Sequence, residues 1–148
     1  MSRRQWIIIT LHHKSSYETL YNLLCAWKSS GIEYNYDELV TMADGPVSSR
    51  YLLQAAAKSI FAIIEYESHG SSSIKSPAIY GSIEDIGLRF LFSEKNNGDC
   101  IIMIMLYYEP WYKQYNRHEE IDWFRYMNLV AKLFNDFAIQ QIETCDEY

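Results

Sequence analysis

The sequence contains few cysteines, and none of them are spaced as a motif. Cys25, Cys100 and Cys145 lie far apart, and no Cys-x-x-Cys pair occurs among the 148 residues. A zinc ribbon or a dithiol redox motif is therefore unsupported. Free thiols of this kind are typical of proteins kept in a reducing compartment.

Glycine is also scarce, with six in the whole chain. They form neither of the two glycine-rich phosphate-binding patterns nor the Gly-x-Ser-x-Gly turn of serine hydrolases. His118 begins a His-Glu-Glu sequence, but position 122 is Asp122 where a zinc protease helix requires a second histidine. We expect no catalytic residue, metal or cofactor of these classes.

Long apolar runs and positive charge are both limited. The run Ile7–Ile9 near the N-terminus is too short for a signal peptide or a membrane span. Lysine and arginine total 13 against 19 acidic residues, which gives a net charge of −6. Nucleic acid and anionic membranes are poor partners for such a chain, whereas a basic protein is a favourable one. We expect a cytoplasmic protein, monomeric or homodimeric.

Hydrophobic residues make up 49% of the chain and aromatic residues 16%, including 13 tyrosines. This composition is that of a folded globular domain, and the length predicts one domain spanning residues 1–148.

The first half of the chain begins with a strand and a helix. The run Gln5–Leu11 predicts a strand that is buried on both faces, and the apolar spacing over Tyr17–Trp27 predicts a helix that stops before Gly31. Residues 32–46 stay ambiguous, although 39–42 could form a short strand. A short helix over 52–58 and a strand over Ile60–Tyr66 are expected next.

A hairpin provides the clearest local signal. Asn97-Gly98 separates two apolar runs and predicts a two-residue type I′ turn. That turn would pair Phe92 with Met103 and Phe90 with Met105, and would place these four side chains together in the core.

A strand within Pro77–Glu84 precedes this hairpin, a helix from Glu119 to about Ala138 follows it, and a strand over Ile139–Thr144 closes the chain. One side of that helix would carry five apolar side chains: Trp123, Met127, Val130, Phe134 and Phe137. The order predicts a single-domain α+β fold, with a mostly antiparallel sheet of about five to six strands and two to three helices packed on it.

Two segments combine aromatic and acidic residues outside the clear elements. The first supplies Glu33, Tyr34, Tyr36, Asp37 and Glu38, and the second supplies Tyr108, Glu109, Trp111, Tyr112 and Tyr115. Tyrosine and tryptophan are enriched at interface hot spots, and carboxylates complement a basic partner. Both segments are candidates for partner binding, although these tyrosines could equally pack with their hydroxyls in solvent.

In overall pattern the chain resembles the immunity proteins that bacteria keep against secreted toxins. The resemblance rests on the strand–helix opening Gln5–Trp27, the hairpin at Asn97-Gly98, the helix Glu119–Ala138 and the acidic balance. It implies a basic toxin domain as partner, often a nuclease, whose active site is covered by acidic side chains. The interpretation is a non-enzymatic protein that binds and neutralises this toxin.

Two alternatives remain open. Aromatic side chains such as Tyr80 and Tyr107 could line a pocket for a small molecule, as in a sensor domain. Glu65 and Glu67, two apart on the expected strand and followed by His69, could instead form an enzyme's acid–base or cation site. Charge at a strand edge would explain these three residues equally well.

Overall fold

The computed structural model describes residues 4–43, 47–68, 77–108, 110–115 and 118–147. Six strands form one antiparallel sheet in the order β2-β3-β4-β5-β1-β8, and a separate hairpin pairs β6 with β7. The strands are β1 (Arg4–Lys14), β2 (Glu33–Tyr34), β3 (Ala78–Ile83), β4 (Ile86–Glu94), β5 (Asp99–Tyr108), β6 (Tyr112–Tyr115), β7 (His118–Ile121) and β8 (Ile139–Glu147). The predicted α+β class, with its antiparallel sheet, is confirmed.

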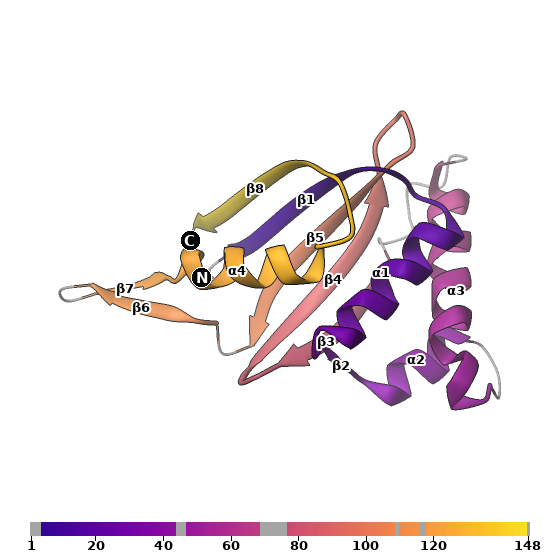
Figure 1. Cartoon of the computed structure of the whole chain (residues 1–148), viewed down its shortest axis with the longest axis horizontal. Helices are drawn as coiled ribbons and strands as arrows, with labels where there is room; N and C mark the ends of the chain where they lie inside the picture. Colours follow the sequence, from indigo (N-terminus) through magenta and orange to yellow (C-terminus); the bar gives the residue numbers. More distant parts are fainter. Residues whose placement is uncertain (1–3, 44–46, 69–76, 109, 116–117, 148) are drawn as a thin grey trace.

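The helices cover one face of the six-stranded sheet (Figure 1). They are α1 (Tyr17–Ser29), α2 (Tyr36–Ala43), the 3-10 turn η1 (Ser49–Tyr51), α3 (Leu52–Ser68) and α4 (Trp123–Leu133). Trp27 of α1 is fully buried at the centre of this layer, and its ring stacks on that of Phe90 with 4.2 Å between centroids. Phe134 approaches the same indole edge-on from the end of α4, so one tryptophan joins the sheet to two helices.

The first strand lies inside the sheet, between β5 and β8, but only one of its faces is fully covered. Ile7, Ile9 and Leu11 are buried beneath the helices, whereas Trp6 and Ile8 are half-buried on the other face. The expectation of a strand buried on both faces is therefore wrong, because the described helices form a layer on one side only.

The strand predicted over Ile60–Tyr66 is wrong, because these residues continue helix α3. Ala56, Ala57, Ile60 and Ile64 are buried at helical spacing, and no glycine or proline interrupts the chain from 52 to 68. Packing beside α1 outweighs the β preference of the local residues. Within the ambiguous stretch 32–46, residues 33–34 form β2 and residues 36–43 form helix α2, so the short strand considered over 39–42 is wrong.

The hairpin of β4 and β5 is confirmed, but its register differs by one residue from the prediction. Phe92 pairs with Ile102 and Phe90 with Ile104, and the Lys95 N–H donates to the Asp99 carbonyl across a three-residue loop. Gly98 alone in this loop has a positive φ, of 90°, whereas a type I′ turn needs two such residues. The shift moves Met103 and Met105 out of the core and onto the opposite face of the sheet.

The last helix is shorter than predicted and is rotated. Residues 118–121 form strand β7, and α4 begins after Asp122, whose side chain accepts a hydrogen bond from the Arg125 N–H. Phe124 is 80% exposed, and the buried side consists of Tyr126, Leu129, Val130 and Leu133. The closing strand is confirmed and extends to Glu147 as β8.

Candidate functional site

The face of the sheet that carries no described helix is largely apolar. We call it the open face and define it by half-buried or exposed side chains that alternate with the core residues: Trp6, Ile8, Tyr80, Arg89, Leu91, Ile101, Met103, Met105 and Tyr107. Strand pairing places them in rows, such as Trp6 beside Met105 and Met105 beside Arg89. The next row runs from Ile8 through Met103 to Leu91.

These side chains can adapt to a partner's surface. Met103 and Met105 are unbranched and polarizable, and methionine is common on surfaces that bind varied partners. Tyr107 is 60% exposed, and its ring meets Tyr80 edge-on at 5.8 Å. Tyr80 is half-buried and Tyr107 is exposed, and the exposure of Tyr107 does not suit the small-molecule pocket considered above.

Carboxylates border the open face at both edges of the sheet. Glu143 of β8 pairs with Ile8, and Glu33 of β2 pairs with Ser82 of β3, so both point to this face. Both residues are exposed. Arg4 and Glu147, 3.9 Å apart and largely in solvent, add a weak ion pair at one corner. An apolar centre with a polar border is the usual organisation of a protein–protein interface.

The first predicted segment divides between structural and exposed roles. The Tyr34 hydroxyl donates a hydrogen bond of 2.7 Å to the Leu24 carbonyl, and burial, followed by the nearby Cys25, raises the pKa of this phenol well above its usual range. The Glu38 carboxylate accepts a hydrogen bond from the Tyr80 N–H and so closes the end of the short β2–β3 pairing. Glu33, Tyr36 and Asp37 remain exposed.

The second predicted segment also contains a structural residue. Trp111 is buried, and its backbone N–H donates a hydrogen bond of 2.9 Å to the Tyr126 hydroxyl. The Arg125 guanidinium lies 4.0 Å from the centre of the Trp111 indole ring. Tyr112 is 37% exposed and donates a long hydrogen bond of 3.4 Å to Gln5. Glu109 and the side chains of Tyr108 and Tyr115 lie outside the described residues.

The two predicted segments do not form one surface. The β6–β7 hairpin, which carries Tyr112, projects from one end of the molecule, and α2 lies at the other (Figure 1). Glu33 alone among their described residues joins the open face, at its β2 edge.

The proposed acid–base group at 65–69 loses its geometric basis. On helix α3, Glu65 and Glu67 are separated by about 200° around the axis, so they do not share a face as they would on a strand. The side chain of Glu67 and all of His69 lie outside the described residues. In the part of the chain that the structure describes, no three His, Cys, Asp or Glu residues are grouped as metal ligands.

Comparison with known proteins does not assign a family to this architecture. No protein-family model, curated protein or solved structure matches the chain. None of the described helices has both the length and the apolar character needed to cross a membrane.

Proposed function

We propose that the chain is a non-enzymatic immunity protein that neutralises a basic toxin, such as a nuclease, by covering its active site. The observation that carries this proposal is the open face: an apolar sheet surface that none of the described helices covers, bordered by Glu33 and Glu143. An exposed apolar patch with a polar border is the usual sign of a protein-binding surface.

The size of the open face suits the centre of an interface. Four paired strands at about 4.8 Å spacing, over roughly six residues each, cover roughly 400 Å². A standard interface buries about 800 Å² per partner, counting its polar rim. The apolar centre is about half of that area, so a polar rim would supply the other half.

The charge of the chain favours a cationic partner. The net charge is −6, and a nuclease must present a cationic channel to bind phosphates. Complementary charge accelerates encounter and selects the partner, while the apolar centre holds the complex together. An inhibitor of this kind would act in the cytoplasm, where an incoming nuclease meets its substrate.

The test begins with the neighbouring genes: we expect one of them to encode a secreted protein with a basic C-terminal domain, and that domain is the partner used in the assay. We expect calorimetric titration to give a one-to-one complex whose association rate, followed by stopped flow, falls steeply between 50 and 500 mM NaCl. The complex should also suppress the toxin's activity. A complex that leaves the toxin fully active, or an association rate that does not depend on salt, would contradict the proposal.

A further inference from the structure

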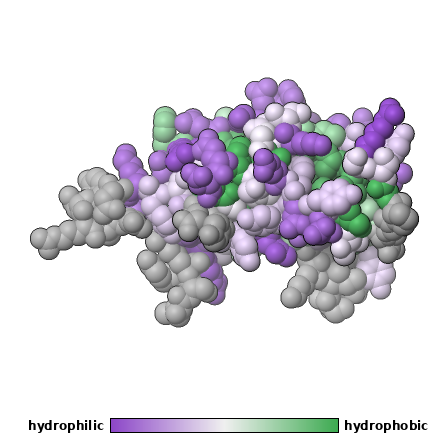
Figure 2. All heavy atoms as spheres, turned by 90° about the horizontal axis from the view of Figure 1, so that it is seen from below, coloured by the Kyte–Doolittle hydropathy of each residue, from purple (hydrophilic) through white to green (hydrophobic). Residues whose placement is uncertain are grey.

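A cavity of about 390 Å³ lies between α1, the β2–α2 segment and the start of α3. It is lined by Lys28, Ile32, Glu33, Tyr34, Tyr36, Leu39, Ser49, Leu52 and Leu53. Its volume falls in the range of pockets that bind small molecules. In the view from below, hydrophobic surface appears among polar side chains on the side of the molecule where α2 and α3 lie (Figure 2).

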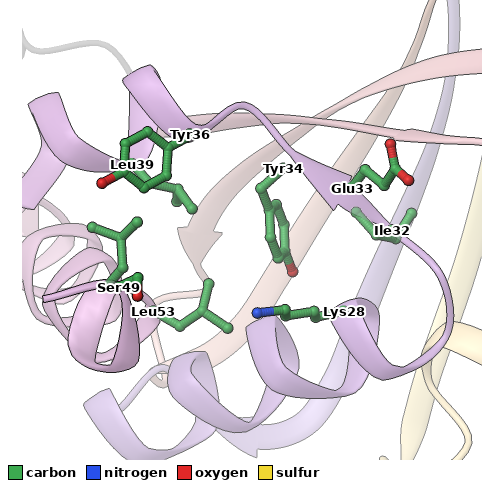
Figure 3. A pocket seen from close by; sticks show the side chains of 9 residues that line it. Lys28, Ile32, Glu33, Tyr34, Tyr36, Leu39, Ser49 and Leu53 are labelled. Atoms are coloured by element: carbon green, nitrogen blue, oxygen red, sulfur yellow. The ribbon is translucent and has the colours of Figure 1, made fainter.

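The walls of this cavity are mainly apolar. Leu39 and Leu52 are almost fully buried behind it, and Leu53 projects into it from α3 (Figure 3). Tyr36, which is 58% exposed, stands at the edge. Tyr34 contributes its ring, because its hydroxyl already donates to the Leu24 carbonyl.

One positive charge faces this apolar lining. Lys28, in the last turn of α1, directs its ammonium into the cavity, while the Glu33 carboxylate points away from it (Figure 3). Among the residues that the structure describes, no carboxylate forms an ion pair with Lys28. An ammonium beside an apolar wall can bind a ligand that has one anionic group and an otherwise apolar structure.

We infer that this cavity binds a small amphipathic monocarboxylate, with its carboxylate on the Lys28 ammonium and its apolar body against Leu39, Leu53 and Tyr36. The single lysine selects a monoanion, since none of the lining residues is an arginine that could bind a phosphate in a bidentate manner. A dianion would bring a second negative charge for which the lining offers no further cation. This site is separate from the open face, and the inference does not depend on the proposed function.

The experiment titrates the full chain, labelled with 15N, with sodium octanoate and follows the backbone amide signals. We expect saturable shifts centred on Lys28, Tyr36 and Leu53. Acetate, which has the charge without the apolar body, should produce none at the same concentrations. Octanol, which has the body without the charge, should bind about tenfold more weakly than octanoate.

A matched pair of variants isolates the ammonium. Lys28→Met should weaken octanoate binding about tenfold and leave octanol binding unchanged. Lys132→Met makes the same change in the last turn of α4, at a residue that does not line the cavity, and should alter neither. Both lysines are exposed, so both variants are expected to keep the native circular dichroism spectrum.

Three results would overturn the inference. One is the absence of saturable octanoate binding, and another is octanoate shifts that map to the open face. The third is an equal effect of the two lysine variants. A toxin complex that fails to form would leave the octanoate titration unaffected, so the two proposals can fail separately.

Discussion

Replacing Tyr126 with phenylalanine removes a single hydroxyl from the joint between α4 and the segment before β6. That hydroxyl accepts a 2.9 Å hydrogen bond from the Trp111 backbone N–H. Both residues are buried, at 1% and 9% exposure, so solvent cannot replace the lost acceptor. The variant therefore tests whether Trp111 is a core residue, as the structure has it, or a partner-binding residue, as the sequence pattern suggested.

The expected cost follows from that buried donor. Leaving a buried N–H unpaired costs about 1–3 kcal/mol, and the ring itself is retained, so little cavity term is added. We expect the free energy of unfolding to fall by about 2 kcal/mol. Tyr66→Phe makes the same chemical change at a ring that is 59% exposed and should stay within about 0.5 kcal/mol of the native chain.

Urea unfolding at pH 7, followed by circular dichroism, measures both variants against the native chain. The dependence of the unfolding free energy on urea concentration must be the same in both variants and in the native chain for their stabilities to be compared. A loss below about 0.5 kcal/mol in Tyr126→Phe, or an equal loss in Tyr66→Phe, would refute the buried hydrogen bond.

Further predictions concern the core, the hairpin and alkaline pH. Phe134→Ala should cost about 3–5 kcal/mol in urea unfolding, because it truncates a buried ring, whereas Phe124→Ala at an 80% exposed site should be near neutral. Gly98→Val should lower the melting temperature, because φ is 90° there; an unchanged value would exclude this loop conformation. Burial, and secondarily Glu94, raises the pKa of Cys100 from 9.0 to about 12. Between these two pH values the thiol stays protonated in the folded state and is deprotonated in the unfolded state. The free energy of unfolding should thus fall as the pH rises from 9 to 12, and less steeply in Cys100→Ala; equal slopes would contradict this reasoning.

The parts of the fold that were predicted correctly are those with strong local signals. The strand formed by the isoleucine run in β1, the spacing of three and four over α1 and the existence of the hairpin around Asn97-Gly98 are decided by nearby residues. The register was missed because Asn96-Asn97-Gly98 suits a three-residue loop as well as a two-residue one. The end of α3 was missed because its apolar residues are β-branched or aromatic, and packing beside α1 decides their structure.

The candidate site was harder to predict for a different reason. Strands β1 and β5 are apolar on both faces, and the sequence does not tell how many faces the helices cover. Trp111 and Tyr34 lie outside the regular apolar patterns, yet each is fixed by a hydrogen bond to a residue 10 or 15 positions away. Glu33 is exposed, and its position at the border of the open face follows only from the pairing of β2 with β3.

A matched pair of lysine substitutions tests most directly whether the open face binds a basic toxin domain, as we propose. Met103→Lys introduces a positive charge at the centre of the open face, and Phe124→Lys makes an equivalent change on the exposed side of α4. The account predicts that Met103→Lys weakens the affinity for the basic toxin domain at least a hundredfold, about 2.7 kcal/mol, and abolishes protection, while Phe124→Lys retains both. Equal affinity of the two variants for the toxin, measured by calorimetry on chains with native circular dichroism spectra, would contradict it.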